Sequence, residues 1–219
     1  DYLGIASFDN VSNYLNHKIL YKKKEDADIN KIYLWIKRCD KKIEKINILE
    51  YSSSNLTLLL KELKIIRNKK FNEEELIKLF NKYGIYLVIE DALNGTKIRG
   101  CTMVKNNNPC IYITRYFKEK TSFYFILYHE IGHIKSDYNK LKNKIMVNNE
   151  ETSEKEIYNF ALNQMIPDNI WNKVKINTLE REKICKDNNI PLCFLYSRLA
   201  YEGIISYKSK EYNSHKEVI

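Results

Sequence analysis

The sequence predicts an α+β fold that is mainly helical, with a small three-stranded sheet and with helical segments at both ends of the chain. Two observations predict it. Apolar residues recur at helical spacing over most of the 219 residues. That period gives way to short extended runs, bounded by turn residues, only between residues 85 and 114. The length fits one large domain, or a medium domain with a smaller one attached.

Residues 1–68 are predicted to be helical. Apolar side chains recur at near-helical spacing over residues 28–45 and again over residues 56–66. Residues 51–55, which read Y-S-S-S-N, lie between these two runs and are typical of a loop with a helix cap.

The next helix and the sheet are marked by caps and turns. Asn72 begins the helix, because Glu75 completes a capping-box pattern, and Gly84 ends it. The period then changes to short extended runs that predict three strands with two intervening turns. The strands cover residues 85–89, 97–104 and 110–114, and the turns cover residues 94–95 and 106–109.

The rest of the chain is predicted to be helical. Thr121 or Ser122 begins an apolar helix that runs through residues 128–134. Ser153 is expected to cap a further helix that ends near Pro167. Residues 179–201 predict two short helices separated at residues 188–191, which read N-N-I-P.

Composition limits the class of protein. Hydrophobic residues make up 44% and charged residues 30% of the chain, which is typical of globular proteins. The longest strongly apolar run, residues 123–128, is far shorter than the roughly 20 residues that cross a bilayer, so we expect no membrane partner. The chain starts at Asp1 without a Met or a leader-like segment, which predicts no signal peptide and a piece of a longer protein.

Charge and cysteine content favour a cytoplasmic location. The net charge is +9 and the pI is about 9.1, a balance that attracts nucleic acid or acidic partners. The lysines are dispersed, however, and only residues 22–24 form a tight cluster, so we favour an ordinary solvated surface. Five cysteines without a C-x-x-C pair fit reduced thiols better than a disulfide framework or a cysteine zinc site.

Residues 128–134, which read Y-H-E-I-G-H-I, carry the strongest functional motif. His129 and His133 are four residues apart, so on a helix they lie on one face and can bind one metal ion together. Glu130 can reach a water molecule at the metal without being a ligand. Zinc lowers the pKa of such a water to about 7, and the glutamate can take its proton, which is the chemistry of peptide hydrolysis.

Chance and simple packing explain this motif poorly. The chain has only four histidines, and about 0.006 matches to H-E-x-x-H are expected from its composition. The alternative is an amphipathic helix that carries two histidines for packing. The apolar residues before the motif predict a buried helix, however, and buried imidazoles need partners. A metal ion supplies one.

Zinc needs a third protein ligand, and no third histidine follows at a suitable spacing. Asp137 lies one further turn along the same helix, so three ligands there would be almost in line and would surround an ion poorly. A glutamate from a second, crossing helix fits better, which leaves Glu154 or Glu156. The downstream carboxylates considered are Asp137, Glu150, Glu151, Glu154 and Glu156.

These motifs resemble the ImmA/IrrE metallo-endopeptidases. Members of that family have a His-Glu-x-Gly-His helix followed by a helix that reads approximately E-x-E-A-N-x-F-A-x-x-L-L-M-P. Here residues 154–161 read E-K-E-I-Y-N-F-A and residues 164–167 read Q-M-I-P, so the Glu, Phe-Ala and Pro positions match without a gap. Ile157 replaces the family's Ala and Tyr158 replaces its Asn. Asp137 stands where many members have a histidine. Residues 100–102 and 109–116 are similar to the family's strands.

The resemblance implies a zincin-like peptidase core in which Glu154 is the third zinc ligand and Glu130 the catalytic base. It implies a zinc metallopeptidase domain over residues 69–170 and a C-terminal helical segment over 171–219. Residues 1–68 would be a helical segment downstream of a missing helix-turn-helix domain, because residues 3–10 and the Trp35 helix resemble the antitoxin-linked subgroup. Tyr158 and Arg115 are candidates for stabilising the oxyanion.

The function implied is that of a bacterial zinc-dependent endopeptidase, a hydrolase whose substrate is a helix-turn-helix repressor. Cleavage would switch on transcription of a mobile-element or stress regulon. The alternative is a regulatory or antitoxin protein that uses a peptidase-like fold to bind a partner, such as a toxin, or to sense a ligand. DNA contact would come only through the missing upstream domain. Direct DNA binding by this chain is the least favoured interpretation, since the second helix of 179–201 offers only Arg198.

Overall fold

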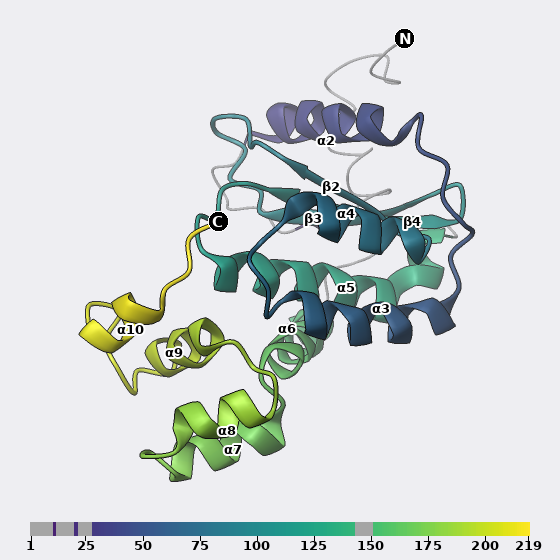
Figure 1. Ribbon diagram of the computed structural model, residues 1–219. Coiled ribbons are helices and arrows are strands. Elements are labelled where there is room, and N and C mark those ends of the chain that lie inside the picture. Colours follow the sequence, from purple (N-terminus) through teal and green to yellow (C-terminus); the bar gives the residue numbers. More distant parts are fainter. Residues whose placement is uncertain (1–10, 12–19, 22–27, 143–150) are drawn as a thin grey trace.

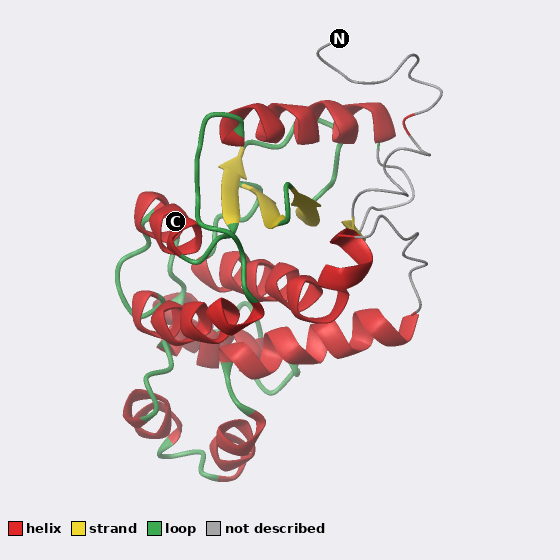
Figure 2. Cartoon of the chain, turned by 90° about the vertical axis from the view of Figure 1, so that its right-hand side faces the viewer, coloured by secondary structure: helices red, strands yellow, loops and turns green. Residues whose placement is uncertain are grey.

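One small sheet lies between two helical layers in the computed structural model, which describes residues 11, 20–21, 28–142 and 151–219. Helix α2 (Ile29–Ile43) covers one face of the sheet, here called the outer face. The other helices of the core lie on the opposite, inner face, as Figures 1 and 2 show. The predicted α+β fold, mainly helical with a small sheet, is confirmed.

The three predicted strands form the sheet. Strands β3 (Gly100–Lys105) and β4 (Asn108–Thr114) make an antiparallel hairpin, and β2 (Tyr86–Glu90) pairs with β4 in parallel. A two-residue strand that was not predicted, β1 (Leu20–Tyr21), pairs antiparallel with β3 and completes the order β1-β3-β4-β2.

Turn geometry sets the ends of the β3–β4 hairpin. Asn106 and Asn107 have φ angles of 48° and 65°, as a two-residue hairpin turn with left-handed residues requires, and asparagine tolerates this conformation well. Asn108 already belongs to β4. Strand β3 begins at Gly100 rather than at residue 97 as predicted, because Lys97 has a φ of 49° and cannot continue an extended strand.

The outer layer is held by one apolar cluster. Asp28 caps α2 by accepting a hydrogen bond from the Lys31 backbone N–H. Trp35 is fully buried and meets the Tyr112 ring edge to face, with centroids 6.4 Å apart. Alternate residues of β2, β3 and β4 point to this face, including Cys101 of β3. The amphipathic pattern of residues 28–45 is thus explained by packing on the sheet.

The inner layer contains four helices and the larger apolar cluster. The Asn72 side chain caps α4 by accepting from the Glu75 N–H, and Gly84 follows that helix with a φ of 75°, both as predicted. Residues 111 and 113 of β4 point into this cluster. The four helices are α3 (Ser53–Ile66), α4 (Glu73–Lys82), α5 (Lys120–Lys142) and α6 (Glu151–Met165).

Helix α6 corrects one prediction. It begins at Glu151, so Ser153 lies inside its first turn instead of capping it. The predicted end near Pro167 is confirmed, because the helix closes at Met165 and Pro167 precedes the next helix.

Four short helices follow and are tied back to the core. The break predicted at residues 188–191 separates the second and third of them. The Lys120 ammonium at the start of α5 is buried and pairs with Glu217 Oε2 at 2.6 Å, and Ile219 N–H donates to the Lys118 carbonyl. The helices are α7 (Asp168–Ile176), α8 (Arg181–Asp187), α9 (Leu192–Tyr201) and α10 (Lys210–His215).

Arg67 joins three parts of the inner layer. Its buried guanidinium follows α3 and donates to the carbonyl of Gln164 at 2.6 Å and of Met165 at 3.3 Å, both at the end of α6. It also donates to the Asn189 carbonyl, in the turn between α8 and α9. The end of α6, and hence its register against α5, is fixed by a cation from a distant helix.

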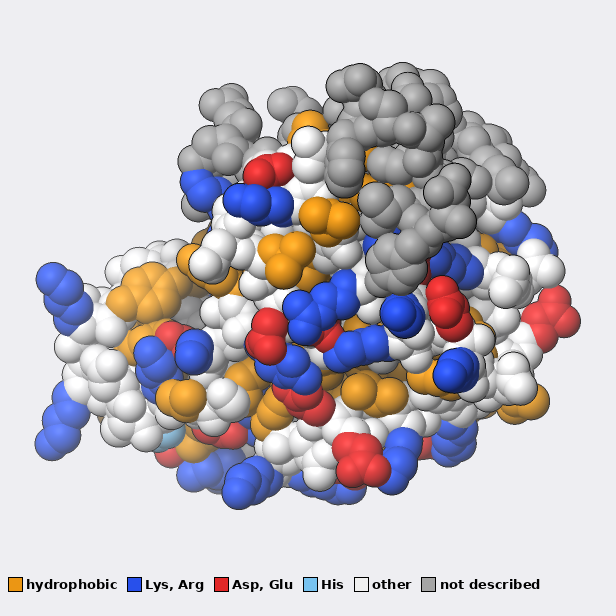
Figure 3. All heavy atoms as spheres, turned by 90° about the horizontal axis from the view of Figure 1, so that it is seen from above, with side chains coloured by type: hydrophobic (Ala, Val, Ile, Leu, Met, Phe, Trp, Pro, Cys, Tyr) orange, Lys and Arg blue, Asp and Glu red, His pale blue; other side chains and the backbone are white. Residues whose placement is uncertain are grey.

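The surface and the thiols agree with the composition. Figure 3 shows basic and acidic side chains interspersed over the described part of the outer face. All five cysteines are free and buried. None of the helices in the described ranges combines the length and apolar character that crossing a membrane needs. Residues 3–10, the lysine cluster 22–24 and Glu150 lie outside the described residues.

Candidate metal centre

The histidine motif lies in the middle of α5, as its apolar approach predicts. Phe123, Tyr124 and Leu127 bury the first half of the helix in the inner cluster. Burial fixes the helix rotation, so the two histidines four residues apart turn toward α6. Their imidazole centroids are 5.0 Å apart.

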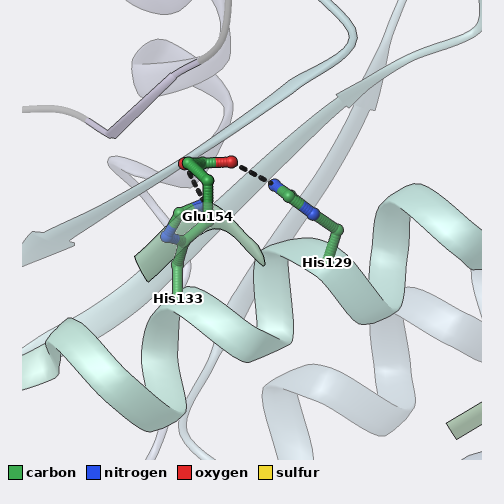
Figure 4. Close-up of side chains that lie close together, drawn as sticks. All are labelled: His129, His133 and Glu154. Atoms are coloured by element: carbon green, nitrogen blue, oxygen red, sulfur yellow. Dashed lines mark ion pairs between the residues drawn. The ribbon is translucent and has the colours of Figure 1, made fainter. Parts of the chain in front are cut away.

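Two helices bring three ligand groups to one point. Glu154 Oε2 lies 3.5 Å from His129 Nε2, and Glu154 Oε1 lies 3.6 Å from His133 Nε2. One ligand atom from each residue lies within 4.8 Å of the others. Figure 4 shows the three side chains pointing toward one another, two from α5 and one from α6. The predicted ligands are brought together, and the group can hold a metal ion.

The donor set fits a divalent cation. Two neutral imidazoles and one carboxylate leave one coordination position open, as in sites that carry out hydrolysis. Glu154 Oε2 is buried and accepts no hydrogen bond from any described residue, and a buried carboxylate oxygen in this state is costly unless a cation compensates it. Among the described residues, the carboxylate of Glu154 is paired with the two imidazoles, His129 at Oε2 and His133 at Oε1.

Gly132 explains why α6 can come so close. A Cβ atom added at this glycine would lie 2.9 Å from Ile157 Cγ2 and 3.2 Å from Phe160 Cδ1, both on α6. A larger residue at position 132 would push the two helices apart and move Glu154 away from the imidazoles. The glycine of the H-E-x-G-H pattern is therefore a packing requirement of the metal group.

Glu130 lies beside the ligand group, with its carboxylate against strand β3. It is buried, and its Oε2 accepts a hydrogen bond from the Thr102 hydroxyl at 2.6 Å. Burial raises the pKa of Glu130 to about 7, against the opposing effects of His133 and of the Thr102 hydrogen bond. A carboxyl group with a pKa near neutrality can both take and return a proton.

Gly100 makes room for the Glu130 carboxylate. A Cβ at residue 100 would lie only 2.8 Å from Glu130 Oε1. Gly100 and Thr102 are two residues apart in β3 and so point to the same, inner face of the sheet. The sequence alone predicted this strand but gave neither residue a role. The alternation of side chains along a strand predicts that residues 100 and 102 share one face of the sheet. How the strand is aligned with α5 could not be predicted from the sequence.

Asp137 contacts His133 through the ring nitrogen that does not face Glu154. Its Oδ2 lies 3.3 Å from His133 Nδ1, and its Oδ1 lies 3.2 Å from Lys140 Nζ. Burial alone would lower the pKa of His133, but the Asp137 hydrogen bond and the nearby carboxylates outweigh burial and raise it. The same bond lowers the pKa of Asp137. Asp137 thus orients an imidazole whose Nε2 faces Glu154, an arrangement common behind metal-bound histidines.

The remaining candidates are not part of the ligand group. Glu156 is exposed and outside the ligand group. The Arg115 guanidinium is held by both carboxylate oxygens of Glu73, at 2.8 and 2.7 Å, at the start of α4. Tyr158 lies one turn after Glu154 on α6, with its ring 5.1 Å from that of Phe125.

Comparison with protein-family models, with curated proteins and with solved structures gives no match for this chain. The assignment of a function therefore rests on the geometry of the centre and on the motif resemblance.

Proposed function

We propose that this protein is a zinc-dependent endopeptidase of the ImmA/IrrE type, acting on a helix-turn-helix repressor. The observation that carries the proposal is the placement of Glu130. It stands beside the group formed by His129, His133 and Glu154 but is not part of it. A site that binds metal only for stability has no need of this buried carboxylate.

Each residue then has a role in hydrolysis. His129, His133 and Glu154 would hold the zinc ion, which supplies Lewis-acid polarisation of the peptide carbonyl and a lower pKa for water. Glu130 accepts the proton of the attacking water and later donates it to the leaving amine. Thr102 and Gly100 fix the carboxylate for both transfers, and Asp137 fixes the orientation of the His133 ring.

The test is a Glu130→Gln variant. Glutamine keeps the size of the side chain and can still accept from Thr102, so the variant is expected to fold and to bind one zinc ion. Cleavage of a co-expressed helix-turn-helix repressor should fall by about 10²–10⁴-fold relative to the wild type, measured as the rate of appearance of the cut product.

The matched control is Glu156→Gln, which removes an exposed carboxylate of α6 outside the ligand group. It should cleave like the wild type. If wild-type protein and Glu130→Gln behave alike in cleavage and in regulation of the repressor's genes, the proposal fails. The protein would then be assigned to the regulatory or antitoxin class.

A further inference from the structure

A cavity of about 450 Å³ lies between α5, α6 and α9, close to the metal centre. Helix α9 is held to the end of α6 by Arg198, whose guanidinium donates to the Ile166 carbonyl at 3.1 Å. Figure 1 shows α6 and α9 side by side below α5. The volume is in the range of sites that bind small ligands or single side chains.

The cavity continues the faces that carry the metal ligands. On α5 it is lined by Ser122 and Phe125, and Phe125 precedes His129 by one helical turn, with ring centroids 6.4 Å apart. On α6 it is lined by Tyr158 and Leu162, which follow Glu154 by one and two turns. The cavity therefore begins about one helical turn from the metal group on both helices.

The metal group is partly exposed to solvent. The side chains of His129 and Glu154 are 13% and 24% exposed, whereas that of His133 is only 6% exposed. His129 is the ligand next to the cavity. A peptide approaching the metal group from solvent thus meets the cavity and the exposed ligands together.

The lining selects large apolar groups. Most of it is aromatic or aliphatic, two arginines (Arg99 and Arg198) also line it, and none of its described lining residues is acidic. An apolar side chain gains by burial there, while an ammonium group would lose its hydration and find no carboxylate in the described lining. The main apolar lining residues are Phe125, Tyr158, Leu162, Met165, Phe194 and Tyr201.

We infer that this cavity is a specificity pocket, which accepts a large apolar side chain of the substrate next to the bond that is cut and disfavours lysine there. The identification of the bound group as a side chain of a peptide substrate rests on the proposed function. Leu162 on α6 and Ser197 on α9 line the pocket and set its depth.

Binding of small hydroxamates tests the pocket without any cleavage. Each compound carries a hydroxamate, which anchors at zinc, and one adjacent side chain: benzyl, isobutyl, methyl or aminobutyl. With zinc-loaded Glu130→Gln protein, we expect the benzyl and isobutyl compounds to bind at least about 10-fold more tightly than the methyl compound. The aminobutyl compound should gain nothing over methyl. Calorimetry gives the four Kd values.

Two Trp substitutions on one helix provide the structural test. Leu162→Trp fills the pocket and should remove the preference for benzyl over methyl. Asn159→Trp places the same bulk on the exposed side of α6, outside the pocket, and should keep that preference. Ser197→Leu fills the pocket from α9 and should act like Leu162→Trp, should the latter fold poorly.

The outcomes separate the two proposals. Equal Kd values for all four compounds overturn the pocket, as does a preference that survives both filling variants. Selective binding, together with a wild-type protein that cleaves the repressor no faster than Glu130→Gln does, overturns the proposed peptidase function and leaves the pocket standing. A zinc-treated protein that binds none of the compounds overturns both.

Discussion

The two faces of the sheet bury charged groups in different ways. On the outer face, the buried Asp40 carboxylate accepts from the Tyr112 hydroxyl at 2.8 Å and pairs with Lys105 at 2.5 Å. Buried Glu90 is paired with Arg38 at 3.0 Å and with Lys42. Each buried carboxylate under α2 thus has a basic partner supplied by the chain.

The inner face lacks this compensation at its centre. In the ion pairs between described residues, neither Glu130 nor Glu154 has a lysine or arginine partner; only imidazoles face Glu154. Buried carboxylates of this kind are unfavourable unless a cation or a proton joins them. The comparison indicates that the carboxylates of the outer face are neutralised within the chain, whereas the inner face carries a group that can hold a metal ion.

The largest expected effect is on stability and comes from the outer face. Trp35→Ala removes a fully buried indole and should lower the free energy of unfolding by about 3–5 kcal/mol. Its neighbour Leu34 is 37% exposed, so Leu34→Ala should cost less than about 0.5 kcal/mol. Urea unfolding measures both. Zinc affinity of the folded protein should not change, and a clear change in Trp35→Ala would show that the two faces are coupled.

The next effect is on catalysis and compares neighbours in one strand. Gly100→Ala would place a Cβ against Glu130 Oε1, so the carboxylate must move. A displacement of about 1 Å can cost about 100-fold in rate, and we expect kcat/KM to fall by that factor with zinc retained. Cys101→Ala changes the side chain that points to the outer face and should leave kcat/KM unaltered. Equal loss in both variants would contradict the assignment of faces.

Much of this arrangement follows from local patterns in the sequence. The helical period of α5, the four-residue spacing of His129 and His133, and the geometric need for a ligand on a crossing helix left Glu154 or Glu156 as partner, and the family resemblance selected Glu154. The strands were predicted because their period of two and the asparagine turns are local features. What is set by neighbours along the chain was predictable.

Features set by contacts between distant parts of the chain could not be predicted from the sequence. The apolar face of α2 predicted burial, but not that it would cover the outer face of the sheet. The bonds of Arg67 to the carbonyls of residues 164, 165 and 189 depend on how three helices meet. The contact of Thr102 with Glu130 depends on how β3 is aligned with α5. Ser153 was misassigned as a cap because serine favours caps in general, whereas α6 had already begun at Glu151.

The smallest expected effect is on zinc affinity and concerns one carboxylate of the inner face, Asp137. Asp137, unlike Asp40, is bound mainly to an imidazole, with His133 Nδ1 at 3.3 Å from its Oδ2. In Asp137→Asn the neutral amide can still accept that hydrogen bond, but it polarises the ring less. Zinc affinity should fall by about 10–100-fold, measured by competition with a chelator.

The control for this variant is Asp187→Asn, which changes an exposed carboxylate on α8 and should leave zinc affinity unaltered. Unchanged affinity in Asp137→Asn would mean that Asp137 serves only its ion pair with Lys140. Asp137 would then resemble the carboxylates of the outer face, which are neutralised by lysine and arginine and take no part in binding a metal. A loss confined to Asp137→Asn would instead extend the metal centre one turn beyond His133, to a residue that contacts the ion only through an imidazole.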